Sequence, residues 1–414
     1  MYLSLRDRPG TSTEPREARR PPVGRVVVTL GVVSLLTDIS SESVASILPL
    51  YLTAVVGLSP AAFGLVDGLY QGISALVRVV SGWGSDRTGH PKWVAMAGYG
   101  LSFVARIFLL FAGGLAAISS VLAVDRIGKG IRTAPRDAMI SAAADPAHLG
   151  RAFGVHRSLD TVGAAIGPLL AALILWAIPD GYGTVLVTSL CFAFLGVALL
   201  GLLVPSGTGA RTPAQAPVPE FRWREVSTPS LRRLLVVAGV LGLLTVGDGF
   251  LYLVLLDSTE FDPRWFPVLY VGTNVAYLAL AVPLGRLADR VGRTRVLVLG
   301  HLALAAAYLC AALPLLGAAT AVVTLALLGT FYAATDGVLA AVAGRVVPAH
   351  LRASGIATAQ TVVVVARMLA SVGFGLLWFA LGPTVAMLAL GAVLAAVVPA
   401  ALAALGRLDE PAPA

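Results

Sequence analysis

The chain has 414 residues, of which 57% are hydrophobic and only 13% charged, and its mean hydropathy is +0.86. Soluble domains carry about 25% charged residues, so this composition excludes an ordinary soluble enzyme and requires lipid as the solvent. The formal net charge of +8 does not indicate a nucleic-acid partner, because the basic residues fall between apolar runs, where they orient helices in a membrane.

The N-terminal residues 1–24 are polar and rich in Arg, Glu and Pro. A signal peptide would place an apolar stretch directly after a short basic region, and this segment has none. We therefore predict a cytoplasmic N-terminal tail.

Twelve apolar segments follow, each long enough to cross the hydrocarbon core of a bilayer as a helix. The fourth is the weakest by hydropathy, because four charged residues interrupt it. An even number of crossings places both termini on one side. The predicted helices are 26–54, 61–82, 92–113, 115–134, 153–178, 183–204, 233–256, 265–285, 296–316, 320–343, 354–381 and 384–405.

The loop charges orient these helices. With both termini inside, basic residues concentrate in the inner loops, and the outer loops contain only Arg264. This asymmetry predicts a multi-pass protein of the inner (cytoplasmic) membrane with cytoplasmic termini. The predicted organisation is a six-helix bundle at 25–204, a Pro-, Thr- and Ala-rich cytoplasmic linker at 205–231, a second bundle at 232–406 and a cytoplasmic tail at 407–414.

An internal repeat supports the division into halves. The segment Gly82–Lys92 (GWGSDRTGHPK) recurs 203 residues later as Gly285–Arg295 (GRLADRVGRTR), and the tetrapeptide Pro-Ala-His-Leu at 146–149 recurs at 348–351. Parallel repeats related by an axis along the membrane normal build one class of transporter around a central site. The sequence thus predicts an all-α membrane protein of twelve transmembrane helices in two pseudo-symmetric six-helix bundles.

The repeated loop, Gly-x-x-x-Asp-Arg-x-Gly followed by basic residues, resembles the signature of the major facilitator superfamily, and the resemblance covers nearly the whole chain. It implies the major facilitator fold, a transporter rather than an enzyme, and a role for this loop as a conformational latch between the bundles in the outward-open state. The first copy departs from the pattern at His90 and Pro91. The implied latch residues are Gly82, Asp86, Arg87, Gly89, Lys92, Gly285, Asp289, Arg290, Gly292 and Arg293.

Two further motifs resemble members of this superfamily that exchange drugs for protons. Leu122-x-x-x-Arg126-x-x-Lys129-Gly130 is similar to a motif whose arginine is linked to proton transfer, with Lys129 in place of the usual glutamine. A glycine pattern in the fifth helix is similar to an antiporter motif, although close helix packing of small residues explains it equally well. The helix-packing residues are Gly154, Gly163, Gly167 and Pro168.

Ionisable residues inside apolar spans are expensive to bury and mark pathways or partners. Asp38 lies near mid-membrane in the first helix, and Glu42 lies one turn further on the same face. On the second helix Asp67, Tyr70 and Gln71 share another polar face.

The fourth helix carries the opposite charge, since Arg126, Lys129, Arg132 and Arg136 follow at spacings of three and four residues and share one face. Three roles for this stripe are open. It receives an anionic substrate, it pairs with carboxylates as a structural and proton-relay network, or part of it meets lipid phosphate. The candidate acidic partners are Asp38, Glu42, Asp137 and Asp160.

The second half supplies fewer polar groups, namely Asp248, Asn274, Asp336 and Arg367. We predict that Asp336 and Arg367 form an ion pair. Arg78 and Arg106 are assigned to snorkelling or packing.

The sequence contains no nucleotide-binding, zinc-type or nucleophile-elbow motif, so we expect no enzyme activity, cofactor or metal. The leading hypothesis is a monomeric transporter that exports a small molecule, coupled to protons, through Asp38 or Glu42 opposite Arg126. Two alternatives remain: transport of an anionic metabolite bound by Arg126 and Lys129, and a receptor or scaffold that moves nothing.

Overall fold

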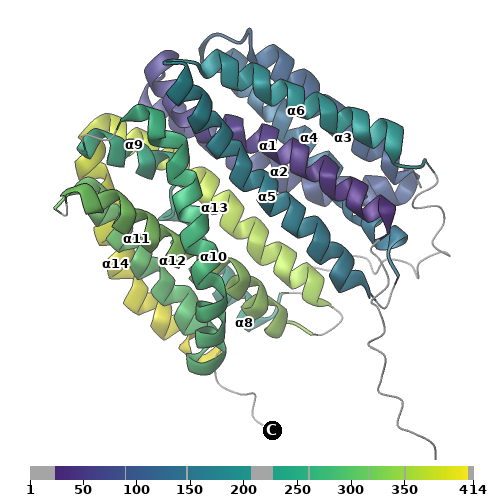
Figure 1. Ribbon diagram of the computed structural model, residues 1–414. Helices are drawn as coiled ribbons and strands as arrows, with labels where there is room; N and C mark the ends of the chain where they lie inside the picture. The colour runs from purple at the N-terminus through teal and green to yellow at the C-terminus, as the bar shows by residue number, and fades with distance from the viewer. Residues whose placement is uncertain are drawn as a thin grey trace, which may run out of the picture.

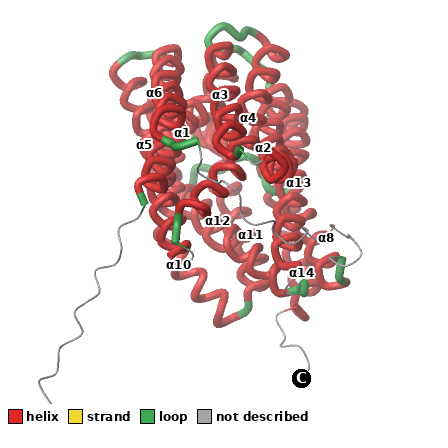
Figure 2. Tube along the Cα trace, turned by 90° about the vertical axis from the view of Figure 1, so that its right-hand side faces the viewer, coloured by secondary structure: helices red, strands yellow, loops and turns green. Residues whose placement is uncertain are grey.

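A computed structural model describes residues 24–88, 90–145, 148–206, 227–259, 262–315, 317–348 and 351–408. Within these ranges every element is helical (Figure 2). The first bundle contains α1 (Arg25–Leu50), α2 (Pro60–Thr88), α3 (Pro91–Leu109), α4 (Gly114–Ala143), α5 (Leu149–Ala177) and α6 (Tyr182–Leu203). A π-helical turn, Tyr51–Val55, extends α1.

The second bundle repeats this arrangement, with its first span divided into two helices. It contains α8 (Pro229–Leu243) and α9 (Asp248–Ser258), then α10 (Phe266–Val291), α11 (Arg293–Ala312), α12 (Thr320–Arg345), α13 (Arg352–Leu381) and α14 (Pro383–Leu405). Short 3-10 turns lie at Pro263–Trp265, Gly317–Ala319 and Gly406–Leu408. Figure 1 shows the two groups of helices side by side.

The predicted architecture is confirmed, since twelve spans form two bundles when α8 and α9 are counted as one. In the described part of the chain, nine helical spans are long and apolar enough to cross a membrane, and α2, α3 and α4 fall outside that group. The charged residues of α4 account for its low hydropathy, as the sequence indicates. All three nevertheless pack within the first bundle, where neighbouring helices surround their polar groups.

Several helices run further than hydropathy predicts. α4 continues through Pro135 to Ala143 rather than ending at residue 134, and α2 continues to Thr88. A hydropathy window detects only the part of a helix that lies in lipid. The helix itself can continue beyond the lipid, because it satisfies its own backbone hydrogen bonds.

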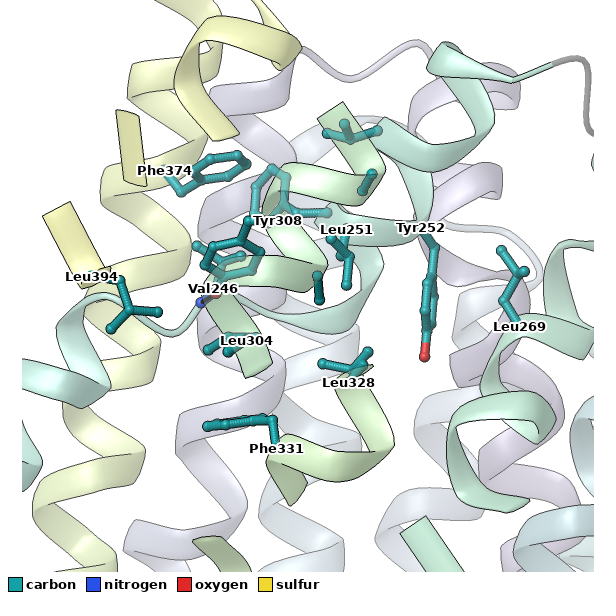
Figure 3. Close-up of a cluster of buried hydrophobic side chains, with 14 of the residues drawn as sticks. Val246, Leu251, Tyr252, Leu269, Leu304, Tyr308, Leu328, Phe331, Phe374 and Leu394 are labelled. Atoms are coloured by element: carbon teal, nitrogen blue, oxygen red, sulfur yellow. Dashed lines mark hydrogen bonds between the residues drawn. The ribbon is translucent and has the colours of Figure 1, made fainter. Parts of the chain in front are cut away.

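The break between α8 and α9 lies inside a predicted continuous helix. The Tyr308 hydroxyl, from α11, accepts a hydrogen bond from Val246 N (3.0 Å) and donates one to Leu244 O (3.2 Å). It therefore pairs backbone groups that the interrupted helix leaves free. Figure 3 shows Tyr308 beside Val246 within the buried apolar core of the second bundle.

We call the end of the molecule where α1 begins and α14 ends the terminal face, and the opposite end the far face. The bundles meet toward the far face, where α2 packs against α13. Gly64 and Gly375 allow this approach, because a Cβ on Gly64 would lie 3.1 Å from the Gly375 Cα. Phe63 of the first bundle stacks edge-on against Phe250 of the second, with ring centroids 4.7 Å apart. The far side is therefore closed by direct packing between the bundles.

Candidate functional site

Asp125 is the centre of a buried charge cluster in the first bundle. Arg126 donates to its carboxylate from Nη2 (2.5 Å) and Nε (3.0 Å), and Arg106 Nε lies 3.3 Å from the other carboxylate oxygen. The side chains of Asp125 and Arg126 are only 6% and 5% exposed. A buried carboxylate between two guanidinium groups is compensated, and so the cluster is stable inside the bundle.

The same cluster joins four helices. Arg126 lies over the ring of Tyr70 on α2, 3.9 Å from its centroid. Arg106, on α3, donates to Ser40 and Ser41 of α1. The prediction that Arg106 snorkels or merely packs is therefore wrong: it is a buried ion-pair partner. Arg126 pairs with Asp125 rather than with Asp38 or Glu42.

Lys129 and Glu42 form a second, more accessible pair. Lys129 Nζ lies 3.6 Å from Glu42 Oε1, and the two side chains are 30% and 31% exposed. Glu42 projects from α1 and Lys129 from α4, so this pair joins these two helices. A partly exposed ion pair can exchange its partner for a ligand at low cost.

The carboxyl groups of Asp38, on α1, and Asp160, on α5, lie close enough to interact with each other. Two basic residues flank Asp160: Arg157 Nη1 at 3.2 Å and Arg136 Nη1 at 3.9 Å. Arg136 also pairs with Asp137 at 3.0 Å. Arg136 at the end of α4 thus lies beside two of the predicted acidic partners, Asp137 and Asp160.

Arg132 forms no ion pair with the Asp125 cluster or with the carboxylates of Asp38 and Asp160 in the described structure. It is buried over the ring of Tyr99, 4.4 Å from the centroid. The predicted basic stripe is therefore divided: Arg126 and Arg132 are buried against aromatic rings, and Lys129 is accessible.

In the second bundle, Asp248 accepts a hydrogen bond from the Tyr332 hydroxyl (2.6 Å), and Arg367 Nη2 donates to the same hydroxyl (3.5 Å). The guanidinium of Arg367 also lies over the rings of Phe331 and Tyr332. In the part of the chain that the structure describes, Asp336 makes neither a hydrogen bond nor an ion pair, so the predicted Asp336–Arg367 pair is wrong. Tyr332, one turn before Asp336, takes that place.

Asp67 lies between the bundles. Its Oδ2 accepts a hydrogen bond from Ser371 of α13 (2.6 Å), and the backbone of Gly247, at the α8–α9 break, packs directly against the carboxylate. Gln71, one turn further along α2, lines a cavity, and Asn274 is exposed on α10. The residues of the predicted polar face of α2 therefore make different contacts rather than forming one site.

The cavity has a volume of about 510 Å³. Its walls come from α2 and from α8, α11, α12, α13 and α14 of the second bundle, and because Leu405 is the last residue of α14, the cavity extends toward the terminal face. This volume is within the range of sites for drug-sized molecules, about 300–1,000 Å³. The polar lining residues are Gln71, Ser74, Thr245, His301, Thr335, Asp336, Gln360, Thr361 and Arg367.

The predicted latch is only partly visible. Gly89 lies outside the described residues. The surroundings of Gly82 and the side chains of Asp86 and Arg87 are also outside the described part of the structure. Lys92 is buried and donates to Gly201 O at 2.9 Å, which ties α3 to α6.

In the second copy of the loop, Asp289 pairs with Arg293 at 2.7 Å across the turn between α10 and α11. That turn contains Gly292 at φ 111°, a conformation that favours glycine. Gly285 and Arg290 lie in the preceding part of α10.

The glycine pattern of α5 has two different roles. Gly163 and Gly167 lie against α1, where added Cβ atoms would come within 2.5 Å of Leu35 O and 2.8 Å of Ile39 O. Pro168 is buried beside them. Gly154 is not a packing residue, because no described atom of a neighbouring element lies within 4 Å of where its Cβ would be. The small-residue interpretation holds for two of the three glycines.

Comparison with known proteins gives one family. The model of the Major Facilitator Superfamily matches residues 30–370 and 258–414. An uncharacterised MFS-type transporter of Methanocaldococcus jannaschii is 29% identical over 360 residues, covering 85% of this chain and 88% of that protein. An uncharacterised protein of Mycobacterium tuberculosis is 36% identical over 171 residues, covering 41% and 42%. The crystal structure of the nucleoside transporter NupG superposes with a TM-score of 0.80 at 13% identity, covering 92% of this chain and 99% of that one.

Proposed function

The chain belongs to the Major Facilitator Superfamily and is a membrane transporter of that kind, and from this premise we propose that it exports a small molecule in exchange for protons. The terminal face is assigned to the cytoplasm, because the basic loops lie there. A cavity that extends toward that face, with the bundles packed together at the far face, then corresponds to an inward-facing state that loads substrate from the cell. We propose that the protein is a monomer in the inner membrane.

The proximity of Asp38 and Asp160 carries the proposal of proton coupling. Ionised carboxylates have oxygen acceptors but no donor, so a proton shared between two neighbouring carboxyl groups would stabilise the pair. Such a pair holds one proton in this conformation and releases it when the helices separate. The pair bridges α1 and α5, so it responds to movement between these helices.

Arg136 and Lys129 place positive charge beside this pair. Arg136 lies 3.9 Å from Asp160, and Lys129, held by Glu42 at 3.6 Å, acts on Asp38 electrostatically. A substrate that drew Glu42 away from Lys129 would leave that ammonium free to stabilise ionised Asp38. Binding of substrate and release of the proton would then be linked.

The test is proton flux in liposomes that contain a pH-sensitive dye, with the purified protein and a panel of cationic, neutral and anionic compounds. Asp38→Asn removes the titrating carboxyl and keeps its size. Asp262→Asn is the matched control, because Asp262 pairs with Arg264 in an exposed turn remote from the cavity. We expect substrate-evoked proton flux in the wild type and in Asp262→Asn, and its loss in Asp38→Asn. Equal fluxes in all three proteins would exclude Asp38 as the coupling group.

The anionic-metabolite alternative depends on an accessible cation. Arg126 is buried against Asp125 and Tyr70, so of the two cations that this alternative names, Lys129 is the accessible one. If only anions evoke flux, and Lys129→Gln abolishes it, this alternative replaces export of a cationic or neutral compound. A scaffold would give no flux with any compound.

A further inference from the structure

The cavity beside α2 lies in the second bundle rather than midway between charged groups of both halves. We propose that it binds organic cations with an apolar body, and that Asp336 receives their charge. This inference rests on the proposed function and specifies the class of substrate.

The charge balance of the cavity singles out Asp336. Arg367 is the cation of the lining, but it is bridged to Asp248 through the Tyr332 hydroxyl, and aromatic rings cover it. Its charge is thereby compensated within the protein. Asp336 is exposed and, among the described residues, makes no hydrogen bond or ion pair. Arg367 acts electrostatically on both Asp248 and Asp336, and one cation balances only one of two ionised carboxylates, so the lining has a net negative charge beside Asp336.

His301 supplies a hydrogen-bond acceptor to the cavity when its imidazole is neutral. Its Nδ1 lies 3.0 Å from the Leu297 carbonyl oxygen, so Nδ1 carries the hydrogen that donates to this oxygen. The remaining nitrogen of a neutral imidazole is an acceptor. A protonated amine or another organic cation would thus meet acceptors on this side of the cavity.

The rest of the wall is suited to an apolar body. Branched aliphatic side chains from five helices line it, and amide and hydroxyl groups are confined to a few positions. Burial of apolar surface supplies affinity without fixing orientation, which suits ligands of varied shape. The aliphatic lining residues are Val237, Leu241, Leu297, Leu339, Val363, Val364 and Leu405.

Tetraphenylphosphonium and tetraphenylborate test this inference because they are similar in shape and opposite in charge. Equilibrium binding is measured on protein in nanodiscs, with empty nanodiscs as the lipid background and no ion gradient. The wild type is expected to bind the cation more tightly than the anion. Asp336→Asn should weaken cation binding about tenfold or more, since it removes a unit charge close to the ligand, and should not weaken anion binding.

Two further variants make the result specific. Asp336→Glu keeps the charge and should retain the preference for the cation, and Asp262→Asn should bind as the wild type does. Equal affinity of the wild type for the two ions, or an unchanged affinity for the cation in Asp336→Asn, would overturn the inference.

The binding assay tests the proposed cation site, and the flux assay tests the proposed exchange, so either proposal can be rejected without the other. Cation binding that depends on Asp336, without proton flux in liposomes, would reject the proposed exchange and keep the site. Proton flux evoked by other compounds, without cation binding, would reject the site and keep the exchange.

Discussion

Gly163→Ala tests the close approach of α5 to α1. The added Cβ would lie 2.5 Å from Leu35 O and 3.0 Å from Leu35 Cα, about 1 Å inside ordinary van der Waals contact. Both neighbours are backbone atoms and cannot rotate away, so the helices must separate. Overpacking of this kind costs about 1–3 kcal/mol.

The helix shift also reaches the proposed proton pair. Asp160 lies one turn before Gly163 on α5, and Asp38 lies one turn after Leu35 on α1. A separation of about 1 Å at the glycine would therefore weaken the contact between the two carboxyl groups. We expect Gly163→Ala to lower both the midpoint of thermal unfolding and the proton flux.

Gly154→Ala is the matched control on the same helix. No described neighbour lies within 4 Å of the position of its Cβ, and alanine is favoured over glycine in a helix by about 1 kcal/mol. The unfolding midpoint should stay the same or rise. Thermal unfolding followed by intrinsic fluorescence, and dye-reported flux, measure both effects. If Gly163→Ala is as stable and as active as Gly154→Ala, the assigned contact between α1 and α5 is incorrect.

Three other substitutions have defined outcomes. Tyr308→Phe removes the hydroxyl that pairs backbone groups at the α8–α9 break. It should lower the free energy of unfolding by about 1–3 kcal/mol, measured by thermal unfolding. An unchanged midpoint would mean that other groups pair with the free backbone atoms at the break. Arg106→Ala leaves Asp125 with one of its two cations and should cost about 3 kcal/mol, whereas a purely snorkelling arginine would cost far less. Gly64→Ala places a Cβ against Ser371 O and 3.1 Å from the Gly375 Cα across the bundle interface and should cost about 1–3 kcal/mol by overpacking; an unchanged unfolding midpoint would contradict the close approach of α2 to α13.

The fold was predictable because lipid imposes one strong constraint on the sequence. Apolar segments and basic loops locate the spans, and even α4, which carries a buried ion cluster, follows from the count of crossings. The break after α8 was missed, although Gly247 and Gly249 flank Asp248 there and glycines of this kind mark an interruption. A hydropathy window averages over such a feature, because the neighbouring residues remain apolar.

The charged contacts were less predictable, for physical reasons that particular residues illustrate. Asp125 and Arg126 are adjacent in sequence, and adjacent helical residues do not normally face each other, but the long arginine side chain folds back onto its neighbour. Arg106 joins them from α3, and nothing in the periodicity of one helix predicts the rotation of another. Asp336 and Arg367 have opposite charges on adjacent helices, yet Tyr332 intervenes. Composition identifies which residues need partners, and packing decides which partners they find.

The second helix shows how the two proposed sites would be coupled. Tyr70 lies beneath Arg126 of the buried cluster, Gln71 lines the cavity of the second bundle, and Asp67 accepts a hydrogen bond from Ser371 across the bundle interface. These three positions fall within two turns of one rigid helix, so a ligand that moves Gln71 also moves the support of Arg126. Because Asp67 and Ser371 belong to different bundles, their hydrogen bond must break when the bundles separate at the far face. Movement of α2 would therefore link substrate in the cavity to the buried charge cluster of the first bundle, which Arg106 joins to α1, the helix of Asp38.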